Sequence, residues 1–316
     1  MRVFISIAAY RDPLLQFTLS RARFLASDPA RLHFTVIDQC QPDAAFLTST
    51  ALAPARLTYL RIDSQQSRGA CWARSIAMSH YEGEDWFFQL DSHMDFEPRW
   101  DERLIAQAQA LREQTGNFVM SSYPRPFEVR KGRVLRPAFD KGVLVHAVAS
   151  AENFEPNNPL LQFQAHRRDE SEPVEGFSLG AGCLFAPGHY IEAFPYDPYY
   201  YFQGEEQALA LRLYTHGWSI FHVPDLPVYH LYARDAVHNE LQRPLHWDAS
   251  EDLGRAQPSH RLDELSKDRL RALVNGQSLG VFGLGSIRNL NEFAAFSGID
   301  YQRGSVEPRA FAGPGC

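Results

Sequence analysis

Short apolar runs alternate with helix-like segments along the first ninety or so residues of the chain. The pattern predicts a first, buried strand at 2–10, which is rich in apolar and β-branched residues, and further strands at 32–40, 56–63 and 85–91. Apolar residues at helical spacing predict helices at 13–26 and 70–81. Strands that alternate with helices are typical of an α/β fold with a doubly wound, mostly parallel sheet.

The next part of the chain changes character. Residues 118–124 and 180–187 are predicted strands, whereas 125–175 is rich in Pro, Asn and charged residues. We expect 125–175 to be a long, partly irregular insertion near a binding cleft. A helix is predicted at 204–218, and a strand and a loop are predicted at 219–232.

The C-terminal part begins with a polar linker rich in His and Arg. It leads to a predicted amphipathic helix at 261–276, and a Gly-rich stretch at 276–290 ends in the start of another helix. We therefore expect a catalytic domain at 1–235 and a C-terminal helical extension at 236–316. The single apolar stripe of the 261–276 helix could cover the core or form an oligomer interface, which leaves the oligomeric state open.

Composition narrows the class of protein. The 316 residues are 45% hydrophobic and 22% charged, which is enough for one large globular domain with an appendage, or for two smaller domains. A net charge of −7 does not favour nucleic acid as a partner. The sequence has no long apolar span and no signal-peptide pattern, and its four cysteines form no CxxC pair. We expect a cytoplasmic protein with reduced cysteines and no transmembrane segment.

The segment "WFFQLDSHMDF" contains the sharpest chemical signal. A buried strand ends at Asp91, and His93 follows two residues later, so both side chains fall on the same side of an extended chain. A carboxylate and an imidazole suit Mn²⁺, with Mg²⁺ as the alternative. His230 in "VYHLY" is the natural third ligand. The alternative is a strand-end carboxylate that caps a turn beside an ordinary histidine.

Two further motifs carry candidate chemistry. "SRGACWARS" places Arg68, Gly69 and Arg74 at the start of a helix, which makes an anion site suited to a diphosphate, or simply a solvated basic face. Glu205 and Glu206 open the helix that follows the aromatic run at 199–202. They could orient a sugar or a reacting group, although the helix dipole alone also favours acidic residues there.

In a parallel sheet, ligands bind beyond the carboxyl ends of the strands. Asp38 and Asp91 stand at two such ends, and the turn at 10–12 stands at a third. Ser92, between the two candidate metal ligands, completes the set of candidate donor-binding residues.

Taken in order, several segments carry a family resemblance. They are "FISIAAYRDP", "SRGACWAR", "FFQLDSHMDF", "SSYP", "PYDPYYYFQGEE", "RLYTHGW" and "VYHLY". The chain resembles the N-acetylglucosaminyltransferases that modify hydroxyproline in a cytoplasmic polypeptide, which are similar in turn to the mucin-type polypeptide N-acetylgalactosaminyltransferases. The resemblance implies a GT-A fold, a UDP-sugar donor (UDP-GlcNAc), a Mn²⁺ cofactor and retention of the anomeric configuration.

The same resemblance assigns roles to residues of this chain. It implies that Asp91, His93 and His230 form the metal shell and that Glu205 faces donor and acceptor. It also implies that Arg68, Gly69 and Arg74 lie beside the diphosphate and that Tyr10, Arg11 and Asp12 lie near the uridine. The chain departs from the eukaryotic pattern at Asp95, where a basic residue is expected.

These considerations predict a metal-dependent glycosyltransferase. Glu205 and Glu206 would orient the sugar or the acceptor, and either would be the first candidate for a general base if transfer were inverting. The acceptor is left open as a hydroxyl of a polypeptide or a glycan. Two other functions fit the same residues, namely a metal-dependent hydrolase of nucleotide sugars or phosphoesters and an inactive or purely binding module.

Overall fold

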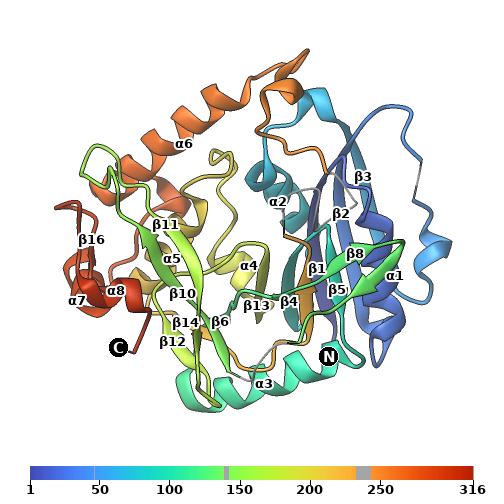
Figure 1. The fold of residues 1–316 in the computed structure, drawn as a ribbon, viewed down its shortest axis with the longest axis horizontal. Helices are drawn as coiled ribbons and strands as arrows, with labels where there is room; N and C mark the ends of the chain where they lie inside the picture. The colour runs from blue at the N-terminus through green and yellow to red at the C-terminus, as the bar shows by residue number, and fades with distance from the viewer. Residues whose placement is uncertain (46, 139–141, 233–242, 316) are drawn as a thin grey trace.

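A computed structural model describes residues 1–45, 47–138, 142–232 and 243–315 of the chain (Figure 1). Its centre is an eight-stranded sheet in the order β12-β14-β6-β13-β4-β1-β2-β3. The strands are β1 (Val3–Tyr10), β2 (Leu32–Cys40), β3 (Arg56–Asp63), β4 (Trp86–Asp91), β6 (Phe118–Met120), β12 (Val174–Gly176), β13 (Cys183–Pro187) and β14 (Ser219–His222).

Strands β1 to β4 run parallel, and this half of the sheet forms from the four apolar runs that the sequence predicts. The next strand, β13, is antiparallel to β4. The expected mostly parallel α/β sheet is therefore confirmed. Tyr10, Asp38 and Asp91 lie at or near the carboxyl-terminal ends of β1, β2 and β4. The register brings these ends together, because Tyr10 pairs with Gln39 and Ala8 pairs with Asp91.

Helices cover both faces of the sheet. They are α1 (Leu15–Leu25), α2 (Ala70–Met78), α3 (Trp100–Thr115), α4 (Tyr190–Ala193), α5 (Glu205–Thr215), α6 (Ser259–Val274), α7 (Leu290–Ser297) and α8 (Pro308–Ala312). Alternate residues of β1 enter different cores, since Ile5 and Ile7 pack with α1 and α3 while Phe4 packs with α2 and α5. Short 3₁₀ turns occur at Pro29–Arg31, Ser49–Leu52, Ser64–Gln66, Ala249–Asp252 and Gly280–Phe282.

A small second sheet joins distant parts of the chain. It consists of β5 (Met94–Phe96), β15 (Val228–His230) and β7 (Arg125–Pro126), with β15 in the middle. The antiparallel pairing of β15 with β5 sets His230 opposite Met94. This register brings His230 next to the end of β4.

The 125–175 stretch contains more regular structure than the sequence predicts. Besides β7 it forms the hairpin β8 (Glu128–Arg130) and β9 (Arg133–Leu135), and the long hairpin β10 (Val143–Ser150) and β11 (Gln162–Arg168). Most residues of β9 and β11 are exposed, so their sequences lack the apolar run that marks a buried strand.

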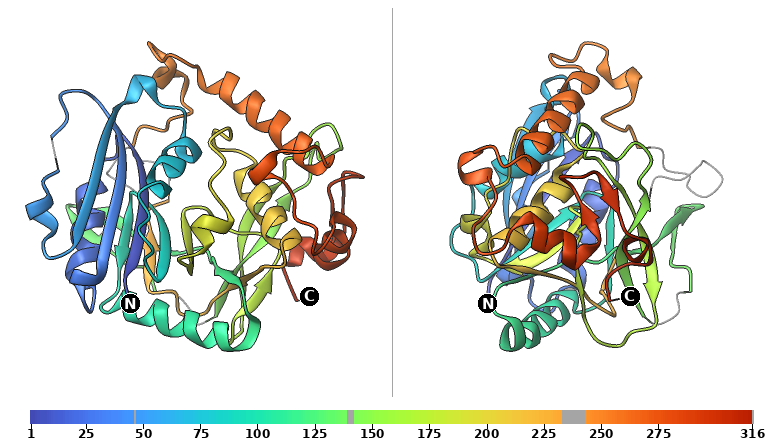
Figure 2. Two further views of the ribbon diagram at one scale, coloured as in Figure 1. Left: turned by 180° about the vertical axis from the view of Figure 1, so that it is seen from behind. Right: turned by 90° about the vertical axis from the view of Figure 1, so that its left-hand side faces the viewer.

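The C-terminal part packs against the rest of the molecule. Helix α6 runs across one end of the fold, from the side of α2 toward α7 (Figures 1 and 2). Leu270 and Leu273 of α6 join the same buried cluster as Leu211 of α5, and the small hairpin β16 (Ile299–Asp300) and β17 (Ser305–Val306) follows α7. The predicted domain boundary at 235 lies outside the described residues. Within the described ranges, no helix has both the length and the apolarity needed to span a bilayer.

Candidate active site

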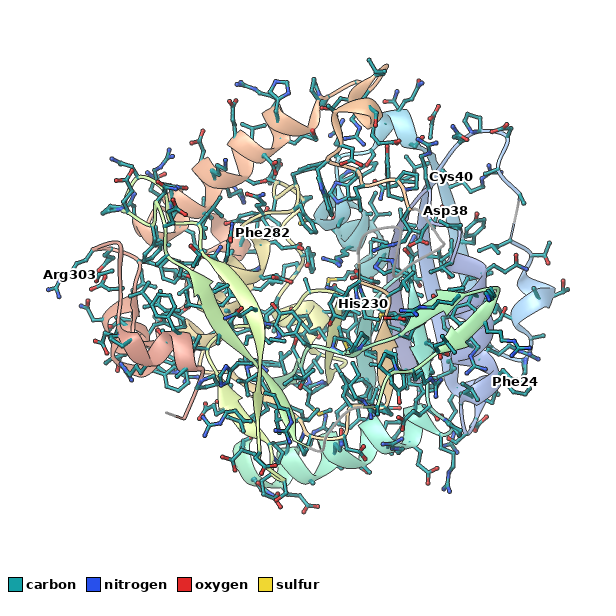
Figure 3. All side chains as sticks on the ribbon, in the orientation of Figure 1. Phe24, Asp38, Cys40, His230, Phe282 and Arg303 are labelled. Atoms are coloured by element: carbon teal, nitrogen blue, oxygen red, sulfur yellow. The ribbon has the colours of Figure 1, made fainter. Side chains whose placement is uncertain are left out.

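The three predicted metal ligands lie together. Asp91 ends β4, His93 follows it, and His230 ends β15, and one ligand atom from each lies within 4.8 Å of the other two. His230 Nε2 is 3.2 Å and His93 Nε2 is 3.8 Å from Asp91 Oδ2. Figure 3 shows His230 near the middle of the molecule, between the half that carries Asp38 and the half that carries Phe282.

The protonation of this cluster suits a divalent cation. Burial and the nearby His93 lower the pKa of His230 to about 4, so its imidazole is neutral at pH 7 and keeps a lone pair. Burial alone would raise the pKa of Asp91, but the His230 hydrogen bond and the charges of His93 and Arg74 outweigh it and lower that pKa. Nδ1 of His230 is buried and has no hydrogen-bond partner in the described part of the chain. One carboxylate and two imidazoles are a donor set that fits Mn²⁺.

Asp12 holds His93 in place. Its Oδ2 lies 2.7 Å from His93 Nδ1 and accepts a hydrogen bond from Ser92 Oγ at 2.6 Å, while its Oδ1 accepts from the backbone of Leu14. With Nδ1 engaged by Asp12, Nε2 of His93 is the nitrogen that faces Asp91. A carboxylate that fixes the tautomer of a metal-binding histidine is a common outer-shell arrangement.

Arg243, which comes from the C-terminal part of the chain, contacts the same imidazole. Its Nη1 lies 2.8 Å from each of the two ring nitrogens of His93 and 3.9 Å from Asp12 Oδ2, and burial lowers the pKa of its guanidinium. A metal ion would need the Nε2 lone pair, so Arg243 would have to leave that nitrogen when a metal binds. The sequence signals only a polar linker here, and the role of Arg243 depends on tertiary contacts.

Arg74 connects the cluster to α5. This buried guanidinium donates from Nη2 to Asp91 Oδ1 at 3.1 Å and from Nη1 to Glu205 Oε1 at 2.9 Å. The other oxygen of Glu205 accepts from Tyr196 Oη at 2.9 Å and from Cys71 Sγ at 2.5 Å. The carboxylate of Glu205 is therefore fully engaged, and it positions Arg74 against Asp91.

Glu206 lies in a different environment from Glu205. Its Oε1 accepts from the backbone N–H of Ala181 at 2.7 Å, and in the described ranges no hydrogen bond reaches Oε2. Burial and the charge of Glu205 raise the pKa of Glu206 to about 7. Of the two predicted catalytic glutamates, Glu206 is the one with a carboxylate oxygen available to a substrate.

A cavity of about 230 Å³ opens beside the metal cluster. Five of the predicted donor-binding residues line it: Tyr10, Asp12, Arg74, Asp91 and Ser92. Phe202, Arg243, His246 and Trp247 also line it. Of these wall residues only Phe202 fell within a predicted candidate motif, the aromatic run at 199–202.

Arg68 and Gly69 do not line this cavity. Arg68 is exposed, with its guanidinium 5.7 Å from the centre of the Trp72 ring. Gly69 has φ 91°, and a Cβ at this position would lie 2.3 Å from the carbonyl oxygen of Tyr201. Gly69 is thus required by the turn into α2, where no other residue fits.

Asp38 and Arg11 also lie outside the 230 Å³ cavity. Asp38 is buried and accepts a hydrogen bond from Tyr59 Oη at 2.6 Å. Arg11 pairs with Glu251 and lines a neighbouring polar cavity of about 350 Å³. A donor role for these two residues stays a prediction.

Asp95, where the chain departs from the expected pattern, has a structural role. It is fully buried and pairs with Arg21 of α1 at 2.7 Å and with Arg136, which follows β9, at 2.6 Å. Asp95 therefore fastens the β8–β9 hairpin to the first helix.

Comparison with known proteins shows the family of the chain and supports its fold. The family model described as "Glycosyltransferase (GlcNAc)" matches residues 42–303, which is most of the chain, and the chain therefore belongs to this family. No curated protein sequence matches the chain.

Among solved structures, that of GalNAc-T7 with UDP, GalNAc and Mn²⁺ is similar, with a TM-score of 0.52, 14% identity and coverage of 92% of this chain and 56% of the other. The chain thus spans little more than half the length of that protein. The structure of Staphylococcus aureus TarS 1-349 in complex with UDP-GlcNAc matches with a TM-score of 0.42, 15% identity and coverage of 86% of this chain and 73% of the other. The sheet order and the likeness to GalNAc-T7 identify the fold as GT-A.

Proposed function

We propose that this protein is an active glycosyltransferase that transfers N-acetylglucosamine from UDP-GlcNAc to a hydroxyl group, with Mn²⁺ as its cofactor. The observation that carries the proposal is the cluster of Asp91, His93 and His230 beside a cavity, in a chain that belongs to a glycosyltransferase family. The structure of GalNAc-T7, which shares the fold, contains UDP and Mn²⁺. The choice of GlcNAc rests on the family description and on the resemblance to the hydroxyproline-modifying enzymes.

The three ligands would hold the metal, whose positive charge would stabilise the diphosphate leaving group. Arg74 is pinned between Glu205 and Asp91, so its guanidinium cannot swing away from the cluster. This fixed positive charge lies at the wall of the donor cavity, where a diphosphate would bind. Glu205 acts through Arg74 as a positioning residue.

Glu206 would contact the acceptor. With one oxygen on the Ala181 N–H, its second oxygen can accept a hydrogen bond from the attacking hydroxyl. Transfer is proposed to proceed with retention, in which the leaving phosphate oxygen takes the acceptor proton and Glu206 orients the hydroxyl. If transfer inverts the anomeric centre, Glu206 is the residue placed to act as base.

Three further assignments belong to the proposal. The site residues include Tyr10, Asp12 and Ser92 on the donor side. Residues 1–235 form the catalytic part, to which Arg243, His246 and Trp247 add part of the donor cavity wall. The protein is proposed to act in the cytoplasm, which rests on the resemblance and on the free thiols of Cys40, Cys71 and Cys183 among the described residues.

The proposal is tested by offering the purified chain a panel of UDP- and GDP-sugars with Mn²⁺ and measuring nucleotide release. We expect UDP-GlcNAc to be the preferred donor. The anomeric configuration of the product, measured by NMR spectroscopy, then tests retention: an α-linkage supports it and a β-linkage contradicts it.

A further inference from the structure

A second cavity, of about 390 Å³, lies next to the donor cavity and shares Phe202 with it. Its lining comes from four separate segments: Tyr123 in the segment after β6, the facing ends of β10 and β11 with the loop between them, the start of α5 with the residues before it, and α6. Both Glu205 and Glu206 reach its wall. A ligand in this cavity would therefore contact Glu206.

Tyr123 provides an aromatic wall beside Glu206. Its ring stacks on His146 with 3.9 Å between ring centres and an angle of 15°, and His146 stacks in turn on His222 at 4.9 Å. Both histidines are fully buried, so the Tyr123 ring is held rigidly from one side. In the described part of the chain, no hydrogen bond uses the Tyr123 hydroxyl, which leaves it available to a ligand together with Glu206 Oε2.

Amides are the largest group of polar side chains around the cavity. They come from Asn153, Asn158, Gln162, Gln203 and Gln207, beside the carboxylates of Glu152, Glu205 and Glu206 and the single ammonium of Lys267. A primary amide offers both donors and acceptors, as does a sugar hydroxyl. Leu160 and Phe163 add apolar surface to the same wall. Apolar and aromatic surface with a few placed amides matches a pyranose ring, which has an apolar C–H face and a rim of hydroxyls.

We propose that this cavity is the acceptor subsite and that the acceptor is a neutral glycosyl residue, one hydroxyl of which contacts Glu206. The inference rests on the proposed transferase function and names its acceptor class. A polypeptide acceptor commonly binds as an extended strand along a sheet edge. Here the lining comes from the β10–β11 hairpin, the start of α5 and Lys267 of α6 around a compact space of about 390 Å³, and this small volume favours a single sugar residue over an extended chain.

Gln162 gives the sharpest test, because β11 contains a matched control. Gln162 is exposed at the start of β11 and lines the cavity, whereas Gln164, on the same strand and also exposed, does not. The full chain is assayed with Mn²⁺ and its preferred nucleotide sugar. Methyl glycosides of neutral hexoses and N-acetylhexosamines are compared with a peptide containing Ser, Thr and hydroxyproline. UDP release without acceptor is measured separately from product formation, which is followed by mass spectrometry.

We expect a methyl glycoside to be glycosylated and the peptide not. Gln162→Ala should raise the KM for the glycoside about 5-fold, the value of one hydrogen bond, with unchanged donor KM and unchanged acceptor-free UDP release. Gln164→Ala should behave like the wild type. Tyr123→Phe, which keeps the stacked ring, should also raise the KM for the glycoside and leave the donor KM unchanged.

Three outcomes would overturn the inference. A Gln162→Ala variant with a changed donor KM would assign the cavity to the donor sugar. Transfer to the peptide alone would make the acceptor a polypeptide. If UDP is released but no glycoside accelerates the release, the acceptor is not a glycosyl residue, although the proposed transferase site still stands. If no UDP is released at all, the proposed function itself is contradicted.

Discussion

Asp12 Oδ2 lies 2.7 Å from Nδ1 of His93, while Nε2 of the same ring lies 3.8 Å from Asp91 Oδ2. The two nitrogens of one imidazole thus face two carboxylates with different tasks. Asp12 fixes the tautomer, and Asp91 lies on the side where a metal would bind. Asp12, which follows β1, thereby orients His93, the metal ligand that follows β4.

This relationship predicts a metal phenotype for Asp12→Asn. Without the negative charge, His93 is oriented less firmly and is a weaker ligand, so the Mn²⁺ concentration for half-maximal UDP release should rise about 10-fold or more. The measurement is a Mn²⁺ titration of activity, with thermal unfolding as a control for the fold. An unchanged half-saturation with Mn²⁺ would show that Asp12 has no role in metal binding.

The contacts of Arg74 predict that its substitution costs far more activity and stability than substitution of Arg68, which belongs to the same motif. Arg74→Lys cannot keep the contacts to Asp91, Glu205 and Tyr196 together, so it should abolish most activity and lower the free energy of unfolding by about 2 kcal/mol or more. Arg68→Lys, at an exposed position, should change stability by less than about 0.5 kcal/mol. Denaturant unfolding of both variants checks this, and equal effects would contradict the role given to Arg74.

The raised pKa of Glu206 predicts that the acceptor kcat/KM depends on pH. Because its pKa is raised to about 7, the carboxyl is protonated below that pH and cannot accept from the acceptor hydroxyl. The acceptor kcat/KM should therefore rise with pH through about 7 and level off above it. Glu206→Gln should be slow and should lose this limb.

The same variant separates catalysis from folding. A carboxyl with a raised pKa destabilises the fold once it ionises, so Glu206→Gln should not lower the melting temperature above pH 7. A Glu206→Gln enzyme that keeps the wild-type pH profile would assign the limb to another group.

The two buried histidines predict acid sensitivity. Burial lowers the pKa of His146 well below its usual value and that of His222 to about 4, so both must be neutral in the folded state. Stability is fully present above about pH 6.5 and is lost as pH falls toward the folded pKa values, by up to about 1.4 kcal/mol per pH unit for each group.

His146→Phe checks this prediction without breaking a side-chain hydrogen bond, because neither ring nitrogen of His146 has a partner in the described residues. The variant should keep the stacking on Tyr123 and lose part of the stability change between pH 6.5 and pH 4. The measurement is urea unfolding across this pH range. A wild-type pH dependence in the variant would mean that other groups cause the acid sensitivity.

The sequence predicts the first half of the fold well, because the parallel strands β1, β2 and β4 are buried and mostly apolar, and the part-buried edge strand β3 still carries apolar residues. Helix α3 at 100–115 received no prediction, although Trp100, Leu104, Ala108 and Leu111 lie at helical spacing and are buried. The β10–β11 hairpin could not be predicted from its second strand, "QFQAHRR", whose side chains are largely exposed.

Asp91 and His93 could be predicted from the sequence because ligands bind beyond the carboxyl ends of parallel strands. His230 was proposed as the third ligand, but it reaches the cluster through the pairing of β15 with β5 in the second sheet. The different roles of Glu205 and Glu206 could not be predicted, since they depend on which carboxylate meets Arg74 across the core. Arg243 and Tyr123 were also out of reach, because each joins the site through contacts between segments far apart in sequence.

The central claim is tested most directly by Mn²⁺-dependent release of UDP from UDP-GlcNAc, measured for the wild type and for Asp91→Ala and His230→Ala. A glycosyltransferase with this metal site should turn over only with added metal, and both variants should lose at least about 100-fold in rate while remaining folded. Wild-type turnover that persists in both variants, or that needs no divalent metal, would contradict the account.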